Sequence, residues 1–217
     1  MKSSVTIVDY GVGNLFSVGR AFEYLGASVI IASTPSQIRE ARCLVLPGVG
    51  SFANGMDGLK QRGLPDPLRE YAATDRPFLG ICLGMQLLFD ESEEFGRHQG
   101  LGLIPGRVRA ITATTSSGKQ HKIPHIGWNA LLLPGSIPKW ENTLLQGIEP
   151  GSSAYFVHSY TAWPEDNSDR LVDCDYDGCL ISAAVRRGGI HGCQFHPEKS
   201  GLVGLQILAN LIDYQHS

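Results

Sequence analysis

Short apolar runs alternate with segments of helical spacing through the first hundred residues. Ser4–Val8 is one such run, and it ends in the sequence Asp-Tyr-Gly-Val-Gly. The segment 14–25 then places Leu15, Val18, Phe22 and Leu25 at helical spacing, and Gly26 follows. This pattern predicts a strand, a loop and a helix.

The same unit recurs further along the chain. Helical material between 59 and 73 is interrupted by Gly63, Pro65 and Pro67. The predicted strands are apolar throughout rather than alternating, which is typical of a parallel sheet covered by helices on both faces. These further strands are 29–32, 43–46 and 78–81.

After Gly100 the pattern changes to short strands separated by Pro, Gly and Ser, and some of them should be antiparallel. The strands predicted here are 107–111, 127–133, 154–160, 180–185 and 190–195, with an exposed loop at 112–120 and a final helix at 201–214. We therefore predict an α/β fold, with an open, mostly parallel sheet flanked by helices and with additional antiparallel strands. Because no repeat or linker divides the chain, residues 1–217 are expected to form a single domain.

Composition excludes several classes of protein. Lys and Arg total 18 against 21 Asp and Glu, for a net charge of −3, so no general attraction to nucleic acid or to an anionic membrane is expected. The longest relevant apolar stretch, 78–89, is shorter than the roughly 18 residues of a membrane span, and the run 5–8 is too short for a signal peptide. Five cysteines without CxxC spacing argue against a disulfide scaffold and a metal site, and favour a cytoplasmic location.

Cys82 is the sharpest chemical candidate. It lies in Gly80-Ile-Cys82-Leu-Gly84, where a buried-type strand runs into a helix predicted to begin at about Leu83. This is the arrangement of a nucleophile elbow, in which glycines on either side allow backbone and helix to approach closely. A lone cysteine is more often a packing residue, but the paired glycines and the strand-to-helix context reverse that preference.

A thiol nucleophile needs a base and a group that orients the base. His196-Pro-Glu198 directly follows the apolar segment 190–195. Residues two apart in an extended segment project the same way, so Glu198 can fix the imidazole tautomer of His196. An ordinary His-Pro turn is the alternative, and the combination with Cys82 favours catalysis over it.

The blocks 80–86 and 195–198 together resemble the class-I, or triad, glutamine amidotransferases, which hydrolyse glutamine and pass ammonia to a synthase. Further blocks resemble the glutaminase subunits of imidazole glycerol phosphate synthases. They lie at 9–14, 46–56, 92–94, 100–106, 124–129, 155–159 and 197–201.

The resemblance implies a mechanism. Cys82 attacks the side-chain amide carbon of L-glutamine, His196 protonates the departing ammonia, and water then releases glutamate from the thioester. The oxyanion would be held by backbone N–H groups of Val49, Gly50 and Leu83, where the neighbouring glycines permit a peptide flip.

The resemblance also implies substrate and partner contacts. The family pairs this subunit with a (β/α)8-barrel cyclase in a heterodimer, which makes imidazole glycerol phosphate and aminoimidazole carboxamide ribotide in histidine biosynthesis. Asn14 and Lys199 match positions near that interface, and no cofactor is implied. The residues that match the glutamine-binding set are Gly48, Gln86, Glu94, His158, Ser159 and Tyr160.

Three alternatives remain at this stage. The chain could serve another synthase, although the block 122–129 argues against that. It could be a non-catalytic binding module on the same fold, which the presence of all three triad residues disfavours. It could also be a general cysteine hydrolase or peptidase, which assays on small esters or peptides would detect.

Overall fold

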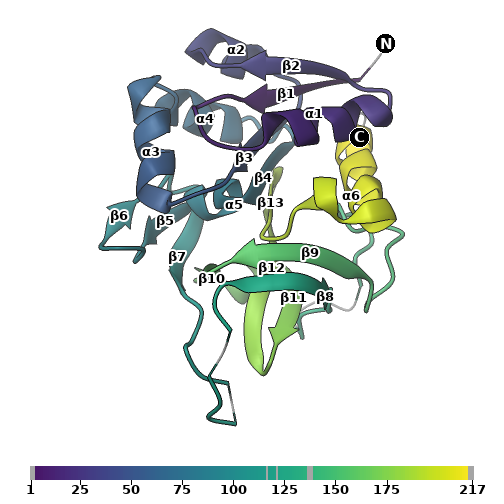
Figure 1. Ribbon diagram of the computed structural model, residues 1–217. Helices are drawn as coiled ribbons and strands as arrows, with labels where there is room; N and C mark the ends of the chain where they lie inside the picture. Colours follow the sequence, from purple (N-terminus) through teal and green to yellow (C-terminus); the bar gives the residue numbers. More distant parts are fainter. Residues whose placement is uncertain (1–2, 116, 121, 136–138, 215–217) are drawn as a thin grey trace.

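A seven-stranded sheet forms the centre of the protein. The structure is a computed structural model, which describes residues 3–115, 117–120, 122–135 and 139–214. The strand order is β11-β12-β13-β4-β3-β1-β2 (Figure 1). The strands β13, β4, β3, β1 and β2 are parallel, and β12 runs antiparallel to both of its neighbours, β11 and β13. The predicted fold class is confirmed. These strands are β1 Ser4–Val8, β2 Ser28–Ala32, β3 Leu44–Gly48, β4 Phe78–Cys82, β11 Arg170–Tyr176, β12 Cys179–Arg187 and β13 Ile190–Cys193.

Helices cover both faces of this sheet. On one face lie α1 (Leu15–Tyr24) and α6 (Gly201–Asp213), and on the other lie α2 (Pro35–Glu40), α3 (Phe52–Gln61), α4 (Pro65–Ala72) and α5 (Leu83–Leu87). Side chains along β1 point to alternate faces of the sheet. Val5 and Ile7 pack against the face covered by α1 and α6, while Val8 packs against the face covered by α2 to α5. Two apolar cores therefore clamp a sheet that is buried on both sides.

Two smaller sheets complete the fold. One has the order β10-β7-β5-β6, and the other is the antiparallel pair β8-β9. The predicted strand 154–160 is thus divided at Ser159, because its two parts join different sheets. The bounds are β5 Phe89–Ser92, β6 His98–Gln99, β7 Ile104–Ala110, β8 His125–Ala130, β9 Ser153–His158 and β10 Tyr160–Pro164, with 3-10 turns η1 at Asn167–Asp169 and η2 at Pro197–Lys199.

The segment 59–73 differs from its predicted form. It contains the end of α3, which begins earlier at Phe52, and the whole of α4. Pro65 is the first residue of α4, where proline is favoured because its missing N–H would have no helical partner. The proline therefore starts a helix rather than breaking one.

The topology brings two distant parts of the chain to one edge of the sheet. β13 lies beside β4 in parallel, with Cys193 opposite Ile81, so residues that follow both strands emerge at the same edge. Within the described part of the chain, no helix has the length and apolar character needed to cross a membrane.

Candidate active site

Cys82 occupies a strained turn at the end of β4. Its φ of 53° and ψ of −111° lie in a region that residues other than glycine seldom adopt. The neighbouring glycines make the turn possible. A Cβ on Gly84 would overlap the carbonyl oxygen of Leu46, and one on Gly80 would lie 2.7 Å from the oxygen of Gly84. The close approach predicted for a nucleophile elbow is present.

His196 and Glu198 form a buried pair just beyond β13. Nδ1 of His196 lies 2.8 Å from Oε1 of Glu198, and the two side chains are 3% and 1% exposed. The His196 backbone is held on both sides, because its N–H donates to Tyr155 and its carbonyl accepts from the Ser200 hydroxyl. The imidazole therefore has a fixed tautomer and orientation.

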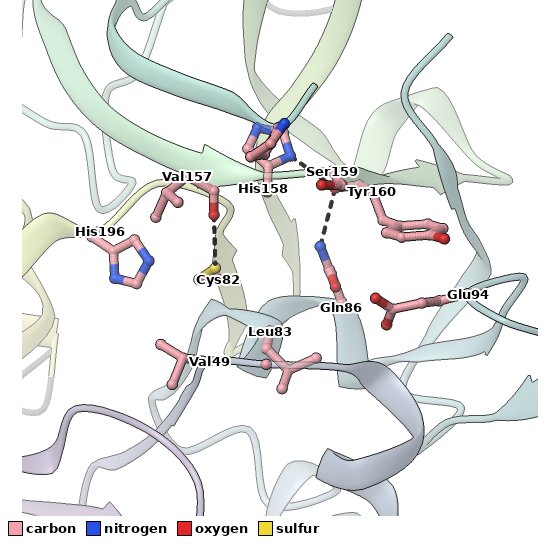
Figure 2. Close-up of a pocket in the computed structure, with 12 residues that line it drawn as sticks. Val49, Cys82, Leu83, Gln86, Glu94, Val157, His158, Ser159, Tyr160 and His196 are labelled. Carbon is pink, nitrogen blue, oxygen red and sulfur yellow. Dashed lines mark hydrogen bonds between the residues drawn. The ribbon is translucent and has the colours of Figure 1, made fainter. Parts of the chain in front are cut away.

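Charge is stabilised on this imidazole. Burial alone would lower the pKa of His196, but Cys82 and Glu198 outweigh it and raise the pKa from its ordinary value near 6.5 to about 9. Nδ1 faces Glu198, while the buried Nε2 has no hydrogen-bond partner among the described residues. Figure 2 shows the ring turned toward Cys82. Because Cys82 raises this pKa as a thiolate, the raised pKa describes the ring once it has taken the thiol proton, and the ring has the orientation of a general base for the thiol.

The thiol itself is directed elsewhere in this structure. Sγ of Cys82 donates to the carbonyl oxygen of Val157 at 3.9 Å, and the side-chain amide of Gln194 donates to the sulfur at 3.8 Å (Figure 2). Transfer of the proton to His196 therefore needs the S–H bond to rotate away from Val157. Sequence reasoning missed Gln194. Its signal in the sequence is a polar residue within an apolar strand segment, and the structure shows that this residue is fully buried.

A cavity of about 310 Å³ opens in front of Cys82 (Figure 2). It brings together most of the predicted site residues from six separate segments. Gly48 and Glu198 lie behind its wall, and Pro124 and Val157 are lining residues that the sequence did not suggest. The lining is Val49, Gly50, Cys82, Leu83, Gln86, Glu94, Pro124, Val157, His158, Ser159, Tyr160 and His196.

Gln86 and Glu94 are fixed on one side of this cavity. Nε2 of Gln86 donates to the carbonyl oxygen of Tyr160 at 3.1 Å, and Oε2 of Glu94 accepts from the N–H of Phe52 at 2.6 Å. Figure 2 shows both side chains reaching into the space beside Cys82. The Glu94 carboxylate is thus held beside the cavity, where it suits an ammonium group.

His158, which the sequence placed in the glutamine-binding set, lines the cavity with both ring nitrogens close to other protein groups. Its Nδ1 lies 2.8 Å from the carbonyl oxygen of Tyr160, and its Nε2 lies 3.0 Å from Nδ1 of the buried His125. Burial lowers the pKa of His158 to about 3, so the ring is neutral. With both nitrogens engaged by the protein, His158 shapes the wall rather than offering a ring nitrogen to a ligand.

The loop after β3 supplies backbone donors. Val49 and Gly50 follow Gly48, whose register partner in the sheet is Cys82, so the loop lies next to the thiol. Within the described residues, the N–H groups of Val49 and Gly50 make no backbone hydrogen bond. Gly50 has a φ of +100°, a conformation open to glycine. Donors of this kind can bind a developing oxyanion.

Asn14 and Lys199 lie outside the cavity. Asn14 caps α1, accepting from the N–H of Ser17 at 3.2 Å, and Lys199 is exposed in η2, next to Glu198 in the chain. Among the described residues, no group of His, Cys, Asp or Glu side chains has the arrangement of a metal site.

Comparisons with known proteins agree with this geometry. The family model for "Glutamine amidotransferase class-I" matches residues 6–213. "Imidazole glycerol phosphate synthase subunit HisH 1" of Legionella pneumophila (strain Lens) is 51% identical, covering 97% of this chain and 99% of the relative. The HisH subunit of Geobacillus kaustophilus is 47% identical, covering 96% and 95%.

Solved structures share the fold at low sequence identity. A structure of PurLQS from Thermotoga maritima matches with a TM-score of 0.73 and 20% identity, covering 99% of each chain. A crystal structure described as a glutamine amidotransferase matches with a TM-score of 0.72 and 15% identity, covering 98% of this chain and 99% of the other.

Proposed function

Because the chain belongs to the class-I glutamine amidotransferases, and within them to the HisH subunits of imidazole glycerol phosphate synthase, we propose that Cys82, His196 and Glu198 hydrolyse L-glutamine in it. The observation that carries the proposal is the strained Cys82 at the mouth of a cavity that the His196–Glu198 pair also faces.

The reaction has two halves that share one histidine. His196 takes the thiol proton, and the sulfur attacks the side-chain amide carbon of glutamine. His196 returns a proton to the departing nitrogen, ammonia leaves, and a thioester forms. Water, deprotonated by His196, then releases glutamate and restores the thiol. Backbone N–H groups of Val49, Gly50 and Leu83 hold the oxyanion in both halves.

Glutamine is oriented by the remaining cavity residues. We assign Glu94 and the hydroxyl groups of Ser159 and Tyr160 to the α-amino and α-carboxylate groups of glutamine, and Gln86 to the methylene groups of its side chain. His158 acts as a wall, since both of its ring nitrogens are engaged by the protein, and Gly48 lies behind the wall, where it leaves room for Tyr10 and Leu83.

We propose that ammonia passes to a (β/α)8-barrel cyclase subunit, which uses it in histidine biosynthesis to make imidazole glycerol phosphate and aminoimidazole carboxamide ribotide. Ammonia is lost to solvent unless an interface encloses it, and exposed apolar side chains support an interface near the triad. Phe16 of α1 is 78% exposed, and it borders a cavity of about 400 Å³ that Glu198 also lines. Trp128, 57% exposed, contacts Tyr155, whose carbonyl holds the His196 backbone.

We name five positions the docking rim: Phe16, Trp128, Lys199 and Leu202, which are exposed, and Asn14, which is half-buried. Their residue types favour a protein partner, because apolar and aromatic side chains mixed with a few polar ones are typical of interfaces. When the cyclase covers the docking rim, the interface excludes water from the triad.

We further propose that residues 1–217 form one glutamine amidotransferase domain and that the enzyme works in the cytoplasm. The family match over 6–213 supports the first statement, as does a cavity lined from both halves of the chain. Five free cysteines, four of them buried, support the second, since reduced thiols are usual in that compartment.

Replacing Cys82 with Ala tests the proposal. Glutamine hydrolysis by the complex with the cyclase should fall to background, a loss of about 10⁴-fold or more, because the nucleophile is gone. Synthesis from added ammonium chloride should persist, since only the nitrogen source is removed. Glutamine hydrolysis that persists in Cys82→Ala, or synthesis from ammonia that is lost with it, contradicts the proposal.

A further inference from the structure

Gln194 lies directly beneath the nucleophile and is fully buried. It follows β13, two residues before His196, and its backbone N–H donates to the carbonyl of Ala183. It does not line the cavity, and both ends of its side-chain amide contact other side chains. Oε1 accepts from Gln86 at 3.0 Å, and Nε2 donates to Sγ of Cys82 at 3.8 Å.

The orientation of this amide follows from its neighbours. The carbonyl oxygen of Tyr160 can only accept hydrogen bonds, so the Gln86 amide must turn its NH₂ group toward it. The second hydrogen of that NH₂ group then meets Gln194, which must present its oxygen. Nε2 of Gln194 is left facing the sulfur. The backbone of Tyr160 thereby sets which atom contacts Cys82.

Resting on the proposed function, we propose that Gln194 is a further catalytic residue, which donates an N–H hydrogen bond to the Cys82 sulfur and stabilises its thiolate form. A thiolate attracts an N–H donor more strongly than a thiol does, because the bond becomes charge-assisted. The contact of 3.8 Å is long for the neutral state and shortens as negative charge collects on sulfur. The site is buried, so the surroundings screen this interaction weakly.

Gln194 complements the contact with Val157. The carbonyl oxygen of Val157 accepts from the thiol and therefore favours the protonated form, whereas the Gln194 amide donates and favours the ionised form. When His196 takes the proton, the first contact is lost and the second strengthens. The balance between them helps to set how readily Cys82 is activated.

Other titratable groups near the sulfur have defined partners. His196 faces it from the segment after β13, with Glu198 behind the ring. Tyr10, from the segment after β1, donates its hydroxyl to the carbonyl of Pro47 at 2.7 Å, and burial raises its pKa far above the ordinary value. His158 is held neutral by burial. None of these supplies the donor that Gln194 supplies.

The test follows alkylation of Cys82 by iodoacetamide as a function of pH, read at the Cys82 peptide by mass spectrometry so that other cysteines do not contribute. Gln194→Met keeps the side-chain length and removes the donor. Gln194→Glu keeps the shape and places a negative oxygen near the sulfur. We expect alkylation at pH 7 to slow about tenfold in Gln194→Met, with its midpoint moved to higher pH, and to slow further in Gln194→Glu. Superimposable profiles for the parent and Gln194→Met overturn the proposal.

Two controls separate this effect from misfolding and from failure of the proposed function. Binding of both variants to the cyclase, measured by isothermal titration calorimetry, should match that of the parent, since it needs a folded subunit but not a reactive thiol. If neither variant folds, NMR of the parent protein labelled with [¹⁵N]glutamine tests the proposal instead. The Gln194 NH₂ signals should then shift with the same pH midpoint as the alkylation of Cys82. Signals that stay fixed through that midpoint overturn the proposal. A parent complex that fails to hydrolyse glutamine contradicts the proposed function, while the alkylation profile still reports on Gln194.

Discussion

At the scale of single residues, reactivity at Cys82 depends on contacts that compete for the sulfur and its proton. Val157, His196 and Gln194 each act on a different state of the thiol. The strained backbone, which costs on the order of 1–3 kcal/mol, holds the sulfur where all three can reach it. Activation is therefore a property of the neighbourhood and not of the cysteine alone.

Glu198→Gln should weaken glutamine turnover without abolishing it. An amide can still orient the ring but cannot stabilise its charge, so we expect a fall of roughly 10³- to 10⁴-fold, smaller than that for Cys82→Ala. Steady-state glutaminase assays of the complex measure it. Unchanged turnover would remove Glu198 from the triad.

The same substitution should change how stability depends on pH. The pKa of His196 rises from near 6.5 when unfolded to about 9 when folded, so its charged form contributes stability fully below pH 6.5. That contribution is lost as the pH rises through about 9. Glu198→Gln removes one cause of the raised pKa and should flatten this loss. Urea unfolding of both proteins from pH 6 to pH 9.5 tests this, and parallel curves would contradict it.

Sequence motifs predicted the residues to which we assign the chemistry, but not the residues that contact them. Cys82, His196 and Glu198 lie within short, recognisable blocks, whereas the supporting contacts join segments far apart in the chain. Gln194 meets Cys82 across 112 positions, and His125 meets His158 across 33. Such pairings depend on strand register, which one sequence does not reveal.

At the scale of elements, packing explains where predictions were incomplete. The start of α3 was missed because Gly55 and Gly58 lower its helical propensity. A Cβ on Gly55 would press on Leu83 and Leu87 of α5, and one on Gly58 would overlap the carbonyl oxygen of Tyr10. Close packing beside the nucleophile thus takes precedence over local preference.

The short helix α2, which the apolar pattern did not predict, has a start signal in the sequence. Thr34 precedes Pro35 and is followed three residues later by Gln37, whose side chain accepts from the Thr34 N–H at 3.1 Å. This is a capping box with proline in the first turn. The missed strand β11 has no comparable signal, because its register is set by pairing with β12.

Gly84→Ala should damage the nucleophile elbow as an element. The new methyl group would overlap the carbonyl oxygen of Leu46 in β3, and neither backbone can move easily, so we expect a loss of about 3 kcal/mol or more in the free energy of unfolding. Chemical denaturation measures it.

Gly19→Ala is the matched control. Gly19 lies within α1, where the added Cβ would make ordinary contacts of 3.7 and 3.9 Å with Val29 and Ile7. Because alanine is the better helix former, this variant should gain about 0.5–1 kcal/mol. Equal effects of the two substitutions would show that contact with Leu46 does not govern the elbow.

At the scale of the whole molecule, the catalytic groups lie close to the surface that we assign to the partner. Glu198 lines the cavity that Phe16 borders, so a partner bound over Phe16 would cover the surface next to the proposed triad. The two apolar cores hold the sheet rigid beneath it.

Phe16→Asp should weaken association with the cyclase about tenfold or more, because it places a charge where an exposed ring is expected to be buried. Isothermal titration calorimetry gives the Kd. Leu180→Asp is the control, since Leu180 is 54% exposed near the turn between β11 and β12, apart from α1 and α6 (Figure 1). Equal affinities of the two variants would place the interface elsewhere.

The position of β13 between β4 and β12 has a consequence for biogenesis. All strands around it leave the ribosome earlier, and the central gap in the sheet stays open until Ile190–Cys193 inserts. His196 arrives only with that insertion. A chain that ends before this strand therefore carries Cys82 without His196, so we expect it not to hydrolyse glutamine.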